Sequence, residues 1–263
     1  DTNSSETCTG ENCGTITIDT EGNTQMRLGG PVHIEDISPE SWVQALKHEG
    51  YRAAICPVRN DADDTVVADY QKAAKTNDIR IAEVGAWSNP ISHDAKKRNE
   101  AIDYCQKQLE LAERIGAKVC VNIAGSRAEQ WDGPSADNFS DETFEMIVDT
   151  TREIIDAVKP RNTFFTLETM PWVFPDSADT YLSLLKAIDR KAFAVHFDPV
   201  NMINSPRLYY QNGAMMKDFF TKLGPYIKSA HAKDILLSKK LTVHLDEVIP
   251  GEGELDYKLF LSE

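Results

Sequence analysis

Glu168, Asp198 and His231 are three ionisable residues that each lie at the end of a short apolar segment of the sequence. Burying such side chains is unfavourable unless they are paired or bind a cation. Two carboxylates and an imidazole suit a divalent cation such as Mn²⁺, Mg²⁺, Co²⁺ or Zn²⁺. The three residues therefore predict a metal centre, with a buried cluster of salt bridges as the alternative.

The elements that must position these residues repeat a pattern of short apolar segment, loop and amphipathic helix. Short apolar runs are typical of strands that are buried on both faces. Seven such strands are predicted: Met26–His33, Tyr51–Val58, Ile79–Ala86, Lys118–Ala124, Thr163–Thr169, Phe193–Val200 and Ile227–Asp234. Helix signals lie between them, including capping serines at positions 38 and 140 and helical spacing over Asp94–Ile115.

Strict alternation of strands and helices predicts an α/β fold with a parallel sheet and right-handed crossovers. An open doubly wound sheet for nucleotides should carry a glycine-rich phosphate loop between its first strand and a helix. Here Gly29-Gly30-Pro31 lies inside or beside the first strand, and no helix begins there. We therefore predict a (β/α)8 TIM barrel, in which active residues gather at the C-terminal ends of the strands.

Further residues at these strand ends could line the same opening. Glu83 and Asn122 are predicted to point toward it. Trp87 and Trp172 could form an apolar wall against a sugar, with core or lid packing equally compatible. Arg127 could clamp a phosphate or carboxylate, although a solvated surface role is the stronger alternative.

The composition describes a globular protein and limits its partners. The chain has 263 residues, with 28 basic and 42 acidic side chains and a formal net charge of −14. This charge argues against nucleic acid and anionic membranes as main partners. No run approaches the roughly 18 apolar residues of a membrane span.

Residues 1–24 are polar and are predicted to be an N-terminal extension, with one short strand at Thr15–Ile18. The barrel domain is predicted over residues 25–263. Cys8 and Cys13 lie in the extension and are expected to be unpaired thiols in a cytoplasmic protein. A disulfide between them, together with the missing initiator Met, would instead fit an exported protein.

Four segments resemble the sugar phosphate isomerase/epimerase family, part of the xylose isomerase-like TIM barrel superfamily. They are FFTLETMPW (164–172), AVHFDPVN (194–201), SAHAKDI (229–235) and PGEGELDY (250–257). The resemblance implies that Glu168, Asp198 and His231 are metal ligands and that Glu168 is also a catalytic base. It implies one divalent ion, with manganese among the candidates, and a metal-stabilised enediolate.

The same resemblance implies roles for neighbouring residues. His196 matches a histidine that contacts substrate oxygens, with a core histidine as the alternative. Lys233 matches a cation that holds substrate or phosphate, with a salt bridge to Asp234 as the alternative. Asn201 stands where the endonuclease branch of the superfamily carries a metal-binding histidine, so that activity is disfavoured and Asn201 is expected to bind substrate.

The resemblance also implies a fourth ligand, a glutamate on the eighth strand. Leu255–Ser262 is predicted to be the helix before that strand, and the sequence ends at Glu263. A barrel that lacks a strand would expose two unpaired edges. We therefore expect the sequence to be a piece of a longer protein, with a missing second carboxylate as the alternative.

These observations together predict a metal-dependent isomerase or epimerase of a carbohydrate, either a sugar or a sugar phosphate. The alternatives are a dehydratase of the inosose type on the same site and a noncatalytic sugar-binding barrel. The expected partner is a small carbohydrate substrate, and neither nucleic acid nor a membrane is expected as a partner. The sequence leaves open whether the chain forms a homo-oligomer.

Overall fold

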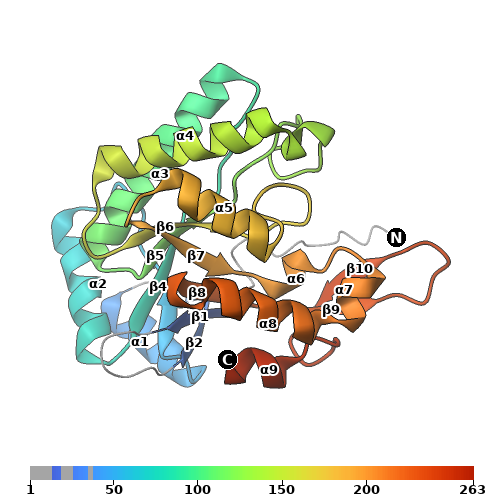
Figure 1. Cartoon of the computed structure of the whole chain (residues 1–263). Coiled ribbons are helices and arrows are strands. Elements are labelled where there is room, and N and C mark those ends of the chain that lie inside the picture. Colours follow the sequence, from blue (N-terminus) through green and yellow to red (C-terminus); the bar gives the residue numbers. More distant parts are fainter. Residues whose placement is uncertain (1–13, 19–25, 35–37) are drawn as a thin grey trace, which may run out of the picture.

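Seven parallel strands of the computed structural model follow the order predicted from the sequence. The structure describes residues 14–18, 26–34 and 38–263. The parallel strands are β2 (Met26–Gly30), β3 (Ala53–Ile55), β4 (Arg80–Gly85), β5 (Val119–Asn122), β6 (Phe164–Glu168), β7 (Phe193–Phe197) and β8 (Ile227–Ala232). Each lies within or close to a predicted segment, and each is paired with the next along the chain (Figure 1). The TIM-barrel prediction is confirmed for these seven units, and an eighth βα unit is not seen in the described residues.

An eighth strand, β1 (Gly14–Ile18), closes the barrel from the other end of the chain. It runs antiparallel to both of its neighbours, with Ile16 opposite Leu28 on β2 and opposite Ala230 on β8. The two edges that seven parallel strands alone would leave unpaired are therefore both paired, because β1 hydrogen-bonds to β2 and to β8. The short strand expected at Thr15–Ile18 is present, and it belongs to the barrel wall.

Helices cover the outside of the strands (Figure 1). They are α1 (Pro39–His48), α2 (Asp64–Thr76), α3 (Ala95–Ile115), α4 (Asp141–Val158), α5 (Ala178–Ile188), α6 (Pro199–Met202), α7 (Pro206–Tyr210), α8 (Asn212–Leu223) and α9 (Tyr257–Ser262), with 3-10 turns at Ala136–Phe139 and Gly224–Tyr226. Ser38 and Ser140 accept hydrogen bonds from first-turn N–H groups, as their sequence positions predict. None of the helices in the described part of the chain has the length and apolar run needed to cross a bilayer.

The buried core fixes β6 and β7, the strands that lead to two of the predicted metal ligands, Glu168 and Asp198. The Tyr181 hydroxyl, from α5, donates to the backbone oxygen of Leu167 at 2.6 Å and accepts from the backbone N–H of His196 at 3.2 Å. These two residues lie on β6 and β7, next to Glu168 and Phe197. One fully buried hydroxyl therefore joins the ends of both strands.

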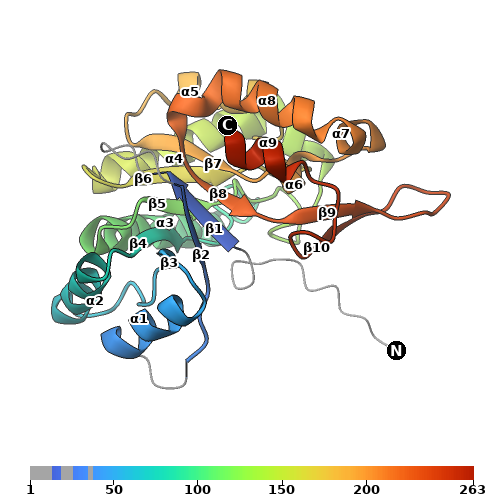
Figure 2. The ribbon, with the colours of Figure 1, turned by 90° about the horizontal axis from the view of Figure 1, so that it is seen from below.

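A two-stranded hairpin after β8 was not predicted from the sequence. Strands β9 (Asp234–Leu237) and β10 (Leu245–Val248) pair antiparallel and project beyond the barrel (Figure 2). The predicted strand Ile227–Asp234 therefore divides, with β8 ending at Ala232 and β9 beginning at Asp234. The expectations for Cys8 and Cys13 lie outside the described residues.

Candidate active site at the strand ends

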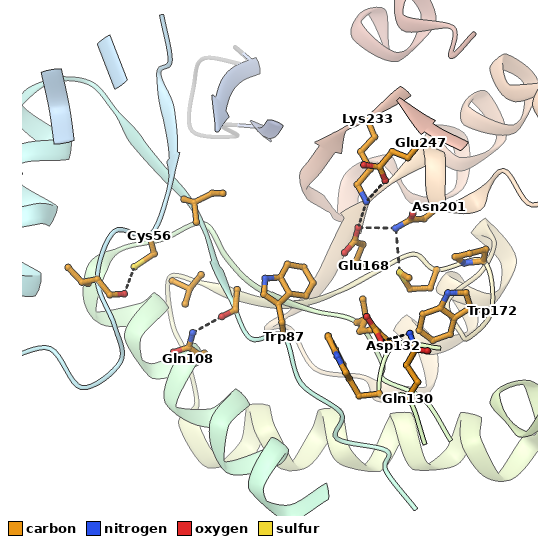
Figure 3. A pocket seen from close by; sticks show the side chains of 18 residues that line it. Cys56, Trp87, Gln108, Gln130, Asp132, Glu168, Trp172, Asn201, Lys233 and Glu247 are labelled. Carbon is orange, nitrogen blue, oxygen red and sulfur yellow. Dashed lines mark hydrogen bonds and ion pairs between the residues drawn. The ribbon is translucent and has the colours of Figure 1, made fainter. Parts of the chain in front are cut away.

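A cavity of about 690 Å³ lies at the C-terminal ends of the strands. Its wall combines an acidic and cationic side with an aromatic side (Figure 3). Glu168, Asn201, Lys233 and Glu247 contribute polar groups, and Trp87, Trp131 and Trp172 contribute indole rings. This position agrees with the rule that barrel strands present active groups at their carboxyl ends.

The structure brings Glu168, Asp198 and His231 together. Glu168 ends β6, Asp198 follows β7, and His231 lies on β8. His231 Nδ1 is 3.1 Å from Glu168 Oε1 and 3.8 Å from Asp198 Oδ2. All three residues are buried. Consecutive parallel strands thus deliver two carboxylates and an imidazole to one point.

Lys233 lies between these carboxylates and the hairpin. Its ammonium nitrogen is 2.9 Å from Asp198 Oδ2, 3.4 Å from Glu168 Oε1 and 3.5 Å from Glu247 Oε2. Burial alone would raise the pKa of Asp198, but the charges of Lys233 and His231, together with side-chain hydrogen bonding to His231 and Glu168, outweigh burial and hold this pKa below its usual value. For Glu168 burial prevails over the Lys233 and His231 charges, and the pKa is raised.

Glu83 makes a contact on the other side of His231. Its Oε2 is 3.3 Å from His231 Nε2, and both side chains are buried. Burial alone would lower the pKa of His231, but the charges of Glu168 and Glu83 outweigh it and hold the pKa well above its usual value. With Nε2–H directed to Glu83, the imidazole turns Nδ1 toward Glu168 and Asp198.

The residues fit a divalent cation. One ligand atom from each of Glu168, Asp198 and His231 lies within 4.8 Å of the other two. Asp198 Oδ2 is buried and accepts no hydrogen bond, although Lys233 pairs with it ionically. Mixed carboxylate and imidazole donors suit Mn²⁺, Mg²⁺, Co²⁺ or Zn²⁺. A second group of candidate ligands, Glu83, His196 and His231, shares the same imidazole.

His196 lies behind His231 rather than in the cavity wall. It is fully buried, and its ring centroid is 4.1 Å from that of His231. Its Nδ1 is 2.7 Å from Ser229 Oγ, while its buried Nε2 has no hydrogen-bond partner. Burial, with the nearby His231 charge, holds the pKa of His196 well below its usual value, so the ring is neutral.

Several of the other predicted residues line the cavity. Trp87 and Trp172 do so, and Trp87 also faces His231 with 6.4 Å between ring centroids. A side chain at Gly85 would collide with the Trp87 indole, so glycine allows this tryptophan to fold back over the strand end. Asn201 Nδ2 donates to Glu168 Oε1 at 3.0 Å. Asn201 thus orients the carboxylate that we expect to act as the base.

Asn122 and Arg127 are placed differently from the expectation. Asn122 is fully buried, and its side-chain amide accepts from Ser88 N–H and donates to Ser88 oxygen, which fixes the loop after β4. Arg127 donates to the backbone oxygen of Ile91 at 2.8 Å and lies 3.8 Å from Glu142. Neither residue is in the cavity wall.

Sequence reasoning missed Glu247, Gln130, Trp131 and Asp132, all of which line the cavity. Glu247 lies on the unpredicted hairpin, and the other three lie in the loop after β5. Residues 245–248 read Leu-Asp-Glu-Val, which shows no alternation of apolar and polar residues, so the sequence gives no signal that locates Glu247.

Asp234, rather than pairing with Lys233, anchors the loop after the hairpin. Its carboxylate accepts hydrogen bonds from the backbone N–H groups of Ile235, Gly251, Gly253 and Leu255, at 2.8 to 3.0 Å. A Cβ at Gly253 would collide with this carboxylate, so the close approach requires glycine there. The two sequence segments SAHAKDI and PGEGELDY are therefore joined by direct contact.

One family profile and several solved structures resemble this chain. The sequence profile described as xylose isomerase-like TIM barrel matches residues 41–263. No curated protein matches the sequence. The fold is similar to that of a probable 3-DHS dehydratase from Bacillus anthracis, with 21% identity, a TM-score of 0.65, and coverage of 87% of this chain and 84% of the other.

Two further solved structures share the fold. A xylose isomerase-like TIM barrel protein from Mycobacterium smegmatis in complex with magnesium is 14% identical, with a TM-score of 0.60 and coverage of 88% of this chain and 79% of the other. The 3-keto-D-glucoside 4-epimerase from E. coli is 15% identical, with a TM-score of 0.59 and coverage of 89% and 85%. At these identities the likeness concerns the fold.

Proposed function

Because this chain belongs to the xylose isomerase-like TIM barrel family, we propose that it is a divalent-metal-dependent isomerase or epimerase of a sugar or sugar phosphate. The observation that carries the proposal is the convergence of Glu168, Asp198 and His231 beside one cavity, with ligand atoms within 4.8 Å of one another. A similar barrel was solved in complex with magnesium, which supports a divalent ion without identifying it.

The residues of the site divide the work between holding a cation, moving a proton and binding substrate. A divalent cation held by Glu168, Asp198 and His231 would supply Lewis-acid polarisation of a substrate carbonyl. Glu168 removes the proton from the carbon next to that carbonyl, and Asn201 keeps its Oε1 oriented through a 3.0 Å hydrogen bond. Lys233 binds a substrate oxygen and balances the buried carboxylates.

The aromatic side of the cavity supports a carbohydrate substrate. Trp87, Trp131 and Trp172 line the cavity, as do polar groups that can bind hydroxyl oxygens. A sugar ring presents an apolar C–H face and a polar edge, which match these two kinds of wall. The indole rings also exclude water from the reacting carbon.

Dehydration on the same site is the second candidate function. It is favoured by the structural likeness to a probable 3-DHS dehydratase. Of the three structures described above, this one has the highest sequence identity to the chain, at 21%. A dehydratase begins with the same proton removal, but a hydroxyl then leaves the neighbouring carbon. Mass spectrometry separates the two reactions, because only dehydration lowers the product mass by one water.

The proposal is tested by hydrogen exchange at carbon. The protein is incubated in D₂O with MnCl₂ and a panel of ketohexoses, their phosphates and inososes, and proton NMR follows deuterium incorporation. We expect Mn²⁺-dependent exchange next to the carbonyl of at least one substrate, and a loss of about 100-fold or more in Asp198→Asn. Absence of exchange with every substrate, in wild-type protein that binds Mn²⁺, would contradict the proposal.

A further inference from the structure

A second cavity, of about 700 Å³, lies at the opposite end of the barrel from the candidate active site. It is found where β4, β5 and β6 begin, and none of the described residues lines both cavities. We call it the basal cavity, and its cationic lining residues are Arg27, Lys75, Arg80, Lys118 and Arg161. We propose that it binds a small anion that carries a diphosphate group, either inorganic pyrophosphate or a nucleotide.

The charge of the basal cavity is opposite to that of the whole chain. The chain has a formal net charge of −14, yet Asp78 is the single acidic residue among the described residues that line this cavity. Cations gathered around one space repel one another, and a cavity lined mainly by one sign of charge concentrates ions of the other sign. A bound polyanion would relieve this repulsion.

Arg27 is held in place before any ligand arrives. Its Nη1 donates to the backbone oxygen of Asp78 at 2.7 Å, and its Nη2 is 2.9 Å from Asp78 Oδ1. The Asp78 carboxylate also pairs with Arg52, so its charge is shared between two guanidinium groups. The Arg27 side chain is only 16% exposed. Fixing a guanidinium in this way lowers the entropy lost when an anion binds.

The other cations come from separate elements around the basal cavity. Lys75 lies in the last turn of α2, Arg80 begins β4, and Lys118 directly precedes β5. Arg161 lies in the loop before β6. Guanidinium groups bind phosphate oxygens in pairs, and lysine binds them as a point charge. A diphosphate carries more charge than one phosphate and is longer, so it can contact cations from several elements at once.

Phe164 adds an apolar side to the basal cavity. It is the first residue of β6 and lines the cavity together with Ile79 and Ile81. Lys228 Nζ lies 5.5 Å from the centre of its ring, which brings a further cation near the same wall. A nucleotide could use this apolar side for its base, whereas inorganic pyrophosphate could use only the cations.

The test compares two double variants that remove the same charge. In Lys75→Gln/Arg161→Gln both altered side chains are exposed, and in the control Lys239→Gln/Lys240→Gln they are exposed on the hairpin connection. Isothermal titration calorimetry without added metal measures the binding of pyrophosphate, ADP and the phosphate-free polyanion citrate. We expect pyrophosphate or ADP to bind wild type and control equally, and to bind Lys75→Gln/Arg161→Gln about tenfold more weakly or worse.

The remaining outcomes decide the matter. Equal affinity in wild type and Lys75→Gln/Arg161→Gln would overturn the site, and so would equal weakening in both double variants, because net charge alone would then explain binding. Citrate binding as tight as that of the diphosphates, or no binding of any probe to wild type, would overturn it too. Tighter binding of ADP than of pyrophosphate would identify a nucleotide as the ligand, and the reverse would identify the inorganic anion.

Discussion

His231 is the residue at which the proposed metal ligands and their supporting groups meet. Glu83 lies on its Nε2 side at 3.3 Å, and Glu168 lies on its Nδ1 side at 3.1 Å. A ligating histidine commonly donates its second N–H to a carboxylate, which fixes the tautomer and the ring orientation. Glu83, expected from the sequence to bind substrate, is therefore better placed to orient His231.

The first prediction concerns Glu83→Gln. The amide cannot serve as a charged acceptor for Nε2–H, so the imidazole is held less firmly with Nδ1 toward the ligand cluster. We expect the Mn²⁺ affinity, measured by isothermal titration calorimetry, to fall by roughly 10–100-fold. Asp246→Asn is the control and should bind like wild type. Equal affinities of wild type and Glu83→Gln would assign Glu83 to another role.

At this scale the sequence could predict chemistry where ionisable residues interrupt apolar strands. Glu168, Asp198 and His231 were expected to converge, and the structure places their ligand atoms within 4.8 Å. The placement of Arg127 was harder to predict, because the sequence of a loop does not indicate where its side chains point. Its guanidinium donates a hydrogen bond to the backbone oxygen of Ile91 instead of lining the cavity. Asn122 lies at the end of a strand, as predicted, but its side chain is fully buried and hydrogen-bonded to the backbone of Ser88.

At the scale of elements, the connections after β5 and β8 shape the site as much as the strands do. The seven parallel strands were predictable because each is a compact apolar run. The β9–β10 hairpin was not predictable, because its apolar residues do not mark a buried face. Those on or beside it include the exposed Leu236, Val243 and Ile249. In addition, the apolar pattern of β8 continues into β9, so no boundary is visible between them. The missed element also carries Glu247.

The second prediction concerns the loop between α4 and β6. Burial would raise the pKa of Glu113, on α3, but hydrogen bonds from the backbone N–H groups of Asn162, Thr163 and Arg161 outweigh it and hold the pKa below its usual value. A carboxylate with a lowered folded-state pKa stabilises the fold above its unfolded-state pKa. This stabilisation is lost as the pH falls through the folded-state value.

Glu113→Gln should therefore lower the free energy of unfolding by about 1 kcal/mol near neutral pH, a modest value because solvent screens the half-buried group. The difference from wild type should shrink as the pH falls below the usual glutamate pKa. Urea unfolding at several pH values measures it. The exposed Glu110 on the same helix provides a matched control, Glu110→Gln. A pH-independent difference would contradict the linkage.

At the scale of the whole molecule, the barrel is closed by a strand from the far end of the sequence. Ile16 on β1 lies opposite Ala230 on β8, so this pairing joins segments more than 200 residues apart. The apolar pattern of a short strand in a polar stretch does not reveal such a partner. The fold class could thus be predicted from repeated local units, while the means of closure could not.

The closed barrel places residues of β4, β6, β7 and β8 around one cluster of candidate metal ligands, and the hairpin adds Glu247 to the wall of the adjoining cavity. We propose that Glu168, Asp198 and His231 hold a divalent cation there. Anomalous diffraction at the manganese edge from crystals grown with MnCl₂ tests it most directly. We expect one Mn²⁺ per chain, at about 2.2 Å from a ligand atom of each of these three residues. A strong anomalous peak elsewhere, or none at this cluster, would contradict it.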